Sequence, residues 1–191
     1  MSVEPRSRNV CVAKLPLPAC LRTRRISGAY RGFMRGDGDG WVKASNGIRY
    51  WGRYGAAGLL LRAPLPDGGM AVLLQRRAIW SHHGGSWGLP GGARDSHESA
   101  QAAAIREAYE ETGVRPGQIS VRESVITAEP TGTEWTYTTV IADTEEPLPV
   151  VPCRESAELS WVAESGVADL RLHPGLAASW QRLRGVLVTP I

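Results

Sequence analysis

Three glutamates at helical spacing, between residues 92 and 114, constrain this chain more than any other feature. Side chains three and four positions apart share one face of a helix, so Glu107, Glu110 and Glu111 are expected to converge on one small volume. Carboxylates packed this closely repel one another unless a cation lies between them. Oxygen ligands suit a hard divalent ion such as Mg²⁺, whose shell is completed by waters and phosphates. The stretch therefore predicts a divalent-cation site on one helix face.

Written as a pattern, residues 92–114 read G-x5-E-x7-R-E-U-x-E-E-x-G-U, where U is an apolar residue. Its fixed positions include Glu98, Arg106 and Gly113. A charged helix face is usually only solvated, but here that explanation needs every fixed position to fall in register by chance. The pattern resembles the signature of the Nudix hydrolases, and the resemblance extends over about residues 54–184.

In that family a loop-helix-loop binds divalent cations against the diphosphate of a nucleotide, and water cleaves the pyrophosphate linkage. The resemblance implies Glu107, Glu110 and Glu111 as metal ligands, with the carbonyl of Gly91 or Gly92 as a further ligand. Glycine suits those positions because the backbone must approach the ion closely. The implied cofactor is Mg²⁺, with Mn²⁺ able to replace it.

Arg106 is expected to orient a glutamate rather than to grip the substrate, because a guanidinium can hold a carboxylate through two hydrogen bonds. Its expected partner is Glu98, near the helix N-terminus, where the helix dipole favours a negative charge. Ala108 departs from the family pattern, which usually has a bulkier aliphatic residue there. This change is expected to alter the packing of the helix and not its charge geometry.

The general base is not fixed by the signature, because family members draw it from the helix or from a later loop. Glu111 is the first choice. Glu158 and Glu155 precede a predicted strand and are alternatives, and two further candidates in another loop are Glu129 and Glu134. A lone loop glutamate usually faces solvent, so the sequence leaves these alternatives open.

Candidate substrate contacts precede the signature. His83 and its neighbour His82 could contact phosphate or exchange protons near neutral pH; the alternative is a pair of exposed imidazoles in a mobile, glycine-rich loop. Trp87 could stack on a nucleobase, or it could pack in the core. Arg76, at the end of a predicted strand, is the third candidate for substrate binding.

The remaining pattern predicts strands mixed with two helices. Strands are expected at residues 56–62, 70–76, 119–127, 135–142 and 159–162. The first two form a hairpin across a turn at 64–69, and the last helix covers about 173–184. This order indicates an α/β (α+β) fold, an α/β/α sandwich with a central mixed sheet and a loop-helix-loop metal site, which is also what the resemblance implies.

The signature helix carries its own start and stop signals. Asp95 or Ser96 can cap it, and Asp95 with Glu98 three residues later resembles a capping box. The helix runs to about Thr112, and Gly113 suits the position that follows a helix. Its alanine side, which includes Ala103, Ala104 and Ala108, is expected to pack closely on a sheet.

Two parts of the chain differ in texture. Residues 1–50 are expected to form an N-terminal extension with a short hairpin around Asn46-Gly47, because Asn-Gly favours tight turns, and residues 51–191 the Nudix domain. Asp37-Gly-Asp-Gly40 lacks the distal glutamate of a calcium loop and is expected to be a plain turn.

Charge and cysteine content narrow the partners. The net charge of +3 is mild, and the basic run Arg22–Arg25 is too short to indicate nucleic-acid binding. No apolar run approaches the length of a membrane span. Cys11, Cys20 and Cys153 show no paired spacing, which fits a reducing compartment, so a cytoplasmic location is expected.

The expected activity is therefore that of a Mg²⁺-dependent pyrophosphohydrolase acting on a small-molecule nucleotide. The first substrate class is nucleoside triphosphates, including oxidised ones, as in MutT-like enzymes. ADP-ribose or another sugar nucleotide is the alternative, favoured by Pro130, sixteen residues after the signature. A nucleotide-binding sensor without catalysis is a second alternative, although such domains typically lose signature glutamates. A homodimer stays open, because dimers occur among ADP-ribose-cleaving relatives.

Overall fold

The computed structural model describes residues 36–45 and 47–187, which belong to one compact unit. The basic run at 22–25, Cys11 and Cys20 lie outside the described residues. Among the helices of the described part, none is both long enough and apolar enough to cross a membrane.

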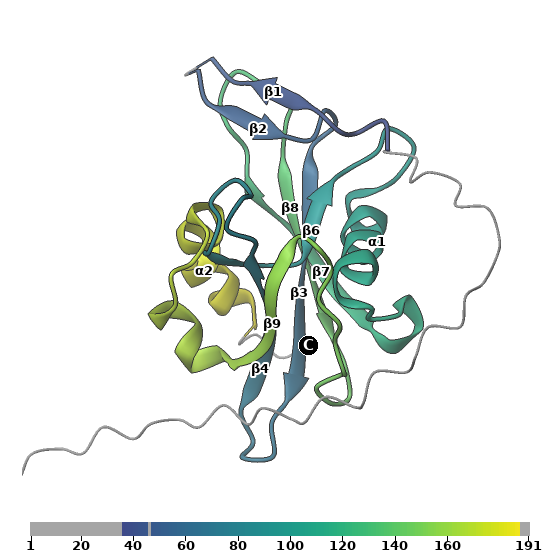
Figure 1. The fold of residues 1–191 in the computed structure, drawn as a ribbon, viewed down its shortest axis with the longest axis vertical. Helices are drawn as coiled ribbons and strands as arrows, with labels where there is room; N and C mark the ends of the chain where they lie inside the picture. The colour runs from purple at the N-terminus through teal and green to yellow at the C-terminus, as the bar shows by residue number, and fades with distance from the viewer. Residues whose placement is uncertain (1–35, 46, 188–191) are drawn as a thin grey trace, which may run out of the picture. The chain divides into compact units, whose positions relative to one another are not determined.

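A seven-stranded mixed sheet forms the centre of the unit (Figure 1). Its order is β5-β4-β3-β8-β7, with β6 pairing on β3 and β9 pairing on β4. The strands are β3 Ala56–Pro64, β4 Met70–Arg77, β5 Trp87–Gly88, β6 Gly91–Ala93, β7 Ser120–Ala128, β8 Tyr137–Asp143 and β9 Ser156–Ala163. The β3–β8 pair is parallel and the other pairs are antiparallel. The predicted hairpin, strands and mixed sheet are confirmed, with ends that shift by a few residues.

Two α-helices cover opposite faces of this sheet, as Figure 1 shows. They are α1, Ala100–Thr112, and α2, Pro174–Leu187, and two short 3₁₀ helices are η1, Pro116–Gln118, and η2, Glu164–Asp169. The layers are therefore helix, sheet and helix, which confirms the predicted sandwich.

The ends of α1 confirm one prediction and correct another. Gly113 adopts the left-handed conformation, with φ of 78°, and its N–H donates to the carbonyl of Tyr109. The N-cap, however, is Ser99, whose side chain accepts from the N–H of Ala102. The predicted caps Asp95 and Ser96 lie outside the helix, because both are bonded to an earlier loop.

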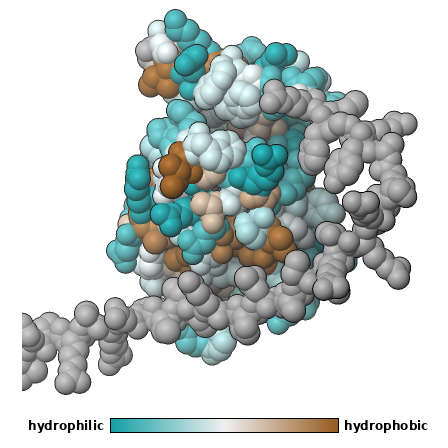
Figure 2. Space-filling view, viewed as in Figure 1, coloured by the Kyte–Doolittle hydropathy of each residue, from teal (hydrophilic) through white to brown (hydrophobic). Residues whose placement is uncertain are grey.

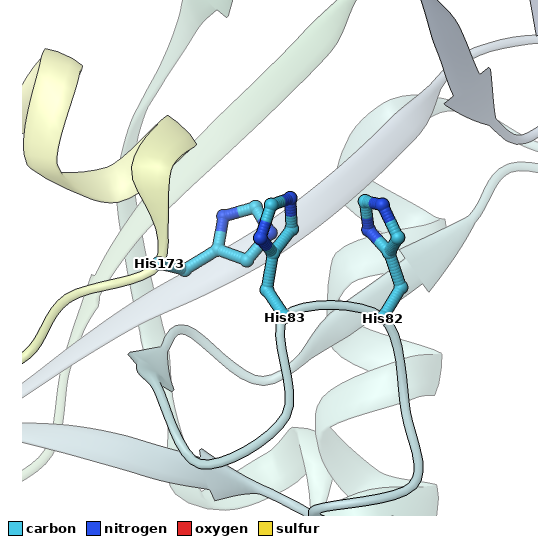
Figure 3. Close-up of side chains that lie close together, drawn as sticks. All are labelled: His82, His83 and His173. Atoms are coloured by element: carbon cyan, nitrogen blue, oxygen red, sulfur yellow. The ribbon is translucent and has the colours of Figure 1, made fainter.

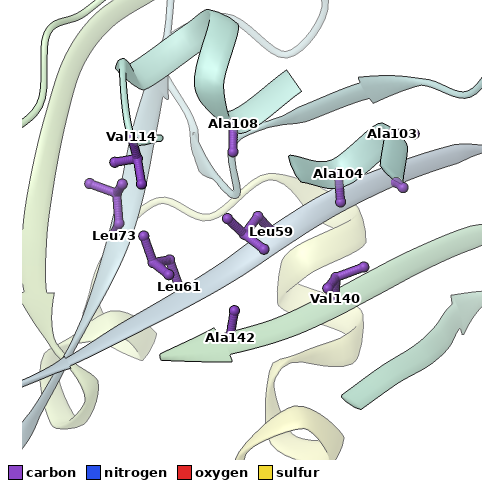
Figure 4. Close-up of a cluster of buried hydrophobic side chains, with 10 residues drawn as sticks. Leu59, Leu61, Leu73, Ala103, Ala104, Ala108, Val114, Val140 and Ala142 are labelled. Atoms are coloured by element: carbon purple, nitrogen blue, oxygen red, sulfur yellow. The ribbon is translucent and has the colours of Figure 1, made fainter. Parts of the chain in front are cut away.

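Each face of the sheet packs its own core, because side chains alternate along a strand. On the α1 face, Leu59, Leu61 and Val140 meet small residues of the helix (Figure 4). These small residues are Ala103, Ala104 and Ala108. On the α2 face, Leu60 and Ile141 pack instead among a second set that consists of Val72, Leu74, Leu89, Val167, Leu176, Trp180 and Leu183. The α1 layer is therefore thin, and the helix lies close to the strands.

A two-stranded hairpin precedes the sheet. Strands β1, Trp41–Lys43, and β2, Arg49–Trp51, pair antiparallel, as Asn46-Gly47 predicted. The hairpin packs on the loop before β8: the indole N–H of Trp135 donates to the carbonyl of Trp51 at 3.0 Å, and Trp135 is buried. The strand predicted at 135–142 therefore begins two residues later, at Tyr137.

The turn before β1 is bonded to the loop before α1. Asp37 accepts hydrogen bonds from the N–H and the hydroxyl of Ser96, and Asp95 accepts one from the N–H of Gly38 at 2.8 Å. The Asp37–Gly40 segment is thus a turn, as expected, and it also fixes residues 95–96 outside the helix.

Large apolar side chains reach the surface mainly near the hairpin and the loop after β4. The most exposed are Ile79, Val151, Trp80, Ile48, Tyr109, Ile126, Trp41, Tyr54, Trp51 and Val121. On the face seen in Figure 2, hydrophobic residues form separate patches among hydrophilic ones.

Candidate metal and substrate site

Glu111 is the buried centre of the candidate site. It is 7% exposed, and its carboxylate accepts hydrogen bonds from the N–H of Gly91 at 2.8 Å and from Nε2 of Gln75 at 3.0 Å. Gln75 reaches it because alternation along β4 turns Gln75 to the α1 face, as it does Leu73. The same Nε2 also donates to the hydroxyl of Ser156 at 2.8 Å, while Oε1 of Gln75 has no partner among the described residues.

The electrostatics around this carboxylate favour a cation. Burial, together with the charges of Glu107 and Glu155, raises the pKa of Glu111 to about 7, against the hydrogen bonds from Gln75 and Gly91. Burial also raises the pKa of Glu107, against its hydrogen bond from Arg106. Two neighbouring acidic groups whose charged forms are disfavoured by burial are a donor set that a divalent ion would stabilise in the charged form.

Arg106 holds the next layer of the site together. It donates to both oxygens of Glu98, at 2.6 and 3.2 Å, and to Glu107 at 2.7 Å. It also donates to the carbonyl of Ala93 at 3.0 Å, and its guanidinium lies 3.8 Å from Glu110. Arg106 therefore joins the helix to β6 and orients a signature carboxylate, with the partner that the sequence suggested.

This network shifts two further pKa values. The hydrogen bonds to Glu98 raise the pKa of Arg106, although burial opposes them. Burial raises the pKa of Glu98, but hydrogen bonds from Arg106 and from the N–H of Asp95 outweigh it and leave the pKa below its usual value. Both groups are thus charged at neutral pH, and the pair is a fixed part of the site.

Two glycines of β6 have different tasks. A Cβ at Gly92 would lie 2.6 Å from the carboxyl carbon of Glu107, so glycine lets that side chain approach the strand. A Cβ at Gly91 would lie 2.3 Å from the carbonyl oxygen of Ala57, so no side chain fits. Antiparallel ladders alternate bonded and non-bonded pairs, and the bond from Arg94 to the carbonyl of Gly55 places Gly92 in a bonded pair with Ala57.

Gly91 is then in the non-bonded position opposite Gly58, so its backbone N–H and carbonyl point away from β3. Its N–H reaches Glu111, and the carbonyl of a strand residue points to the same side as its N–H. Of the two carbonyls that the sequence offered, that of Gly91 is the one directed at the acidic site.

The signature carboxylates are neighbours but do not yet form one tight ligand set. In the described part of the chain, His82, His83 and His173 form one group of three ligand atoms within 4.8 Å of one another, and Asp37, Asp95 and His97 form the other. Glu107 and Glu110 are spaced around the guanidinium of Arg106. Since the side chain of Glu110 is 45% exposed, it is free to rotate toward an ion beside Glu107.

Arg76 and Glu158 lie on the opposite face of the sheet from the signature glutamates. They are register partners across β4 and β9, and their charged groups are 3.7 Å apart. Their neighbours Gln75 and Leu159 point to the α1 face, so alternation turns this pair to the α2 face. The structure does not bring either residue to Glu111.

Trp87 lies on the same side as that pair. Its ring is half-buried against the α2-side core, and its backbone bonds to the segment before α2. The packing alternative is therefore the one that the structure favours for Trp87. His83, by contrast, is exposed in the loop between β4 and β5.

Glu155 is the loop glutamate on the site's side. Its charge raises the pKa of both Glu107 and Glu111, and no described side chain forms an ion pair or hydrogen bond with its carboxylate. Sequence reasoning missed Gln75, although the alternation of side chains along β4 would have placed it on the face that α1 covers. It also missed His173, because no local pattern connects that residue with residues 82–83.

Comparison with known proteins identifies the family to which the chain belongs. The model of the NUDIX domain matches residues 55–183. A protein of Mycobacterium tuberculosis H37Rv named "Putative 8-oxo-dGTP diphosphatase 3" is 66% identical over 159 residues, which are 82% of this chain and 73% of the relative. A fusion protein of Bifidobacterium longum, "Nucleoside triphosphate pyrophosphatase/Nudix hydrolase", is 40% identical over 76% of this chain and 30% of its own length.

A solved structure agrees with both. The crystal structure of the Nudix hydrolase RenU from M. smegmatis has a TM-score of 0.77 and 63% identity, and it covers 81% of this chain and 99% of its own. Nudix hydrolases generally use divalent metals, which the acidic groups on α1 suit. The chain thus belongs to the Nudix family and is a MutT-like hydrolase of pyrophosphate bonds.

Proposed function

We propose that this enzyme hydrolyses nucleoside triphosphates, including oxidised deoxynucleotides such as 8-oxo-dGTP, to a nucleoside monophosphate and pyrophosphate. The 66% identity to a protein named for 8-oxo-dGTP supports the substrate class. The observation that carries the chemistry is the close docking of α1 on β6, with Glu111 bonded to Gly91 and Glu107 lying against Gly92. We also propose a cytoplasmic location, which the free thiol of Cys153 supports.

We assign the cation, Mg²⁺ or in its place Mn²⁺, to Glu107, Glu110, Glu111 and the carbonyl of Gly91. When bound, a divalent ion polarises phosphoryl oxygens and lowers the pKa of a bound water. The chain's own contribution is to fix the ligands: Gly91 and Gln75 hold Glu111, and Arg106 holds Glu107. This prior organisation is what makes charge stabilisation effective in a transition state.

For the proton of the attacking water we favour Glu155 as acceptor. Both carboxylate oxygens of Glu111 are already engaged, by Gln75 and Gly91, and Glu111 is assigned to the cation. Glu155 acts electrostatically on the same two glutamates, and no described side chain forms an ion pair or hydrogen bond with its carboxylate. We do not propose Glu158 as the general base, because it pairs with Arg76 on the α2 face of the sheet.

Two matched variants test this assignment. Glu155→Gln is expected to lower kcat by about 10²–10⁴-fold, the usual contribution of a general base, while Glu158→Gln keeps kcat within about threefold. Steady-state kinetics at saturating Mg²⁺ would measure both. A large loss in Glu158→Gln with Glu155→Gln unaffected would reverse the assignment.

The substrate is tested by product analysis on a panel that holds dGTP, 8-oxo-dGTP, ADP-ribose and a dinucleoside tetraphosphate. Pyrophosphate release that needs Mg²⁺, is fastest with 8-oxo-dGTP and falls by at least about 10²-fold in Glu110→Gln and Glu111→Gln is the expected result. Fastest cleavage of ADP-ribose would replace the proposed substrate by a sugar nucleotide. Binding without turnover across the panel would point to a sensor.

A further inference from the structure

Three imidazoles from two distant parts of the chain meet at one place (Figure 3). His82 and His83 lie in the loop between β4 and β5, and His173 directly precedes α2. One ligand atom of each lies within 4.8 Å of the others. The ring centroids are 4.0 Å apart for His82 and His83 and 4.8 Å apart for His83 and His173. The fold, and not local sequence, assembles this group.

The loop holds His83 in an unusual backbone conformation. Its φ of 57° is the single positive value at a non-glycine residue in the described part of the chain, and such a conformation is intrinsically unfavourable for a residue with a side chain. The carbonyl of His83 accepts hydrogen bonds from the N–H of Ser86 at 3.2 Å and from its hydroxyl at 2.6 Å. The loop therefore turns this imidazole toward His173 against an intrinsic preference.

The second segment is joined to the same loop through β5. The N–H of Trp87 donates to the carbonyl of Arg171 at 2.8 Å, and the N–H of His173 donates to the carbonyl of Trp87 at 2.7 Å. Both histidine-bearing segments are thus fixed on one strand. The three rings are positioned before any ligand arrives.

We propose that His82, His83 and His173 bind one divalent transition-metal ion, with Zn²⁺ as the favoured occupant and a fourth coordination position open to solvent. Imidazole nitrogen is a preferred ligand of zinc, copper and nickel, whereas Mg²⁺ takes oxygen. Three protein ligands with one open position are the arrangement of zinc sites that exchange their fourth ligand. The group shares no residue with the signature glutamates, and it does not rest on the proposed function.

The chemistry of the rings supports this assignment. An imidazole in its neutral form has one nitrogen lone pair to give, so each of the three rings can supply one ligand atom to the same ion.

Two features of the site weaken the binding of the ion. The guanidinium groups of Arg77 and Arg171 act on these rings, and they would repel a dication. In addition, the N–H of Gly175 donates to Nδ1 of His173 at 3.2 Å, a bond that must break whichever ring nitrogen binds the metal. The ion is thus held less tightly than in a closed structural site, and an anion in the open position would offset the positive charge.

The test is a titration of the full chain, without a histidine tag and freed of metal, with Zn²⁺ in the presence of excess Mg²⁺. Calorimetry is expected to give one Zn²⁺ per chain. Affinity should fall by at least about tenfold in each of His82→Gln, His83→Asn and His173→Gln. Asparagine at position 83 tolerates a positive φ, so that variant keeps the loop conformation.

His97→Gln is the matched control, because His97 belongs to the other group of candidate ligands. It is expected to bind Zn²⁺ like the wild type. The metal-free Tm of each variant shows whether it is folded, and His82→Gln, an exposed position, keeps the test valid if a second variant unfolds. Absence of Zn²⁺ binding, loss in only one of the three variants, or loss in His97→Gln or Glu110→Gln instead would overturn the proposal.

Discussion

At the scale of single residues, the site depends on two glycines that have no side chain as much as on its charged residues. Glu107 reaches β6 because Gly92 has no side chain, and Glu111 is held by a backbone N–H that Gly91 directs at it. Arg106 then joins Glu98 and Glu107 through one planar group. The signature therefore encodes contacts within the chain as well as the proposed ligands of an ion.

Gly92→Ala separates these two tasks. The added Cβ would meet the end of a flexible side chain, the carboxylate of Glu107, so the fold should adapt with little loss of Tm. The displaced carboxylate should nevertheless lower kcat by about 10²-fold, as displacements near 1 Å commonly do. Kinetics and thermal melting would be compared with Gly117→Ala, where a Cβ meets nothing within 4 Å. Equal activity of both variants would contradict the role of Gly92.

Glu98→Gln tests the ion pair through pH. The folded-state pKa of Glu98 is lowered, so its charge stabilises the fold above its unfolded pKa, and this stabilisation is lost as pH falls through the folded pKa. At pH 7 the variant should be less stable by roughly 1–3 kcal/mol, as for hydrogen bonds to a charged group. Urea unfolding from pH 7 to pH 3 should show the difference fading below about pH 4. A difference that is the same at every pH would exclude the charge as its cause; the exposed Glu145→Gln is the control.

At the scale of elements, α1 is placed by its alanines. Ala103, Ala104 and Ala108 are almost fully buried against the strands, and this close approach lets Glu111 reach Gly91. Ala108, where the family usually has a larger residue, belongs to the same contact.

Ala104→Leu should move the helix away from the sheet. Overpacking of a filled core costs about 1–3 kcal/mol, and the bond from Gly91 to Glu111 should lengthen with the shift. We expect a lower urea midpoint together with lower kcat at saturating Mg²⁺. Ala102→Leu, on the exposed side of the same helix, is the control and should change neither value. An active, stable Ala104→Leu would show that the helix position is not set by these alanines.

The sequence predicted most elements because apolar alternation and glycine positions are local signals. It misplaced the start of α1 because Asp95, Ser96 and Ser99 are all good caps, and only the turn at Asp37 decides between them by bonding Ser96. The candidate Glu158 likewise needed the register of β4 with β9 to be placed on the α2 face. Pairings between distant segments carry no signature in one sequence.

At the scale of the whole molecule, the hairpin β1–β2 is part of the fold's framework, although the family match begins after it, at residue 55. The turn that precedes it, at Asp37 and Gly38, bonds to residues 95–96, and its last strand contacts Trp135. The rings of Tyr50 and Trp135 lie 4.7 Å apart. These contacts connect the loop before α1 with the loop before β8.

Two deletions measure this contribution. Removal of residues 1–54 should lower Tm by about 5 °C or more relative to removal of residues 1–34, because Trp135 loses its cover and Ser96 loses the Asp37 carboxylate. Calorimetry would compare the two chains. Equal Tm values would mean that the hairpin adds nothing to stability. Trp135→Phe, which removes only the indole N–H, should give a smaller decrease.

The unequal thickness of the two layers has a consequence for engineering. On the α2 side, large residues such as Trp180 and Leu183 fill the space between helix and sheet, so changes to these core residues are expected to alter stability and to leave the signature carboxylates in place. On the α1 side, the close spacing set by the alanines places the signature carboxylates beside β6. Substitutions meant to raise Tm should therefore be made in the α2 layer. Variants selected for high kcat should keep the alanines of α1.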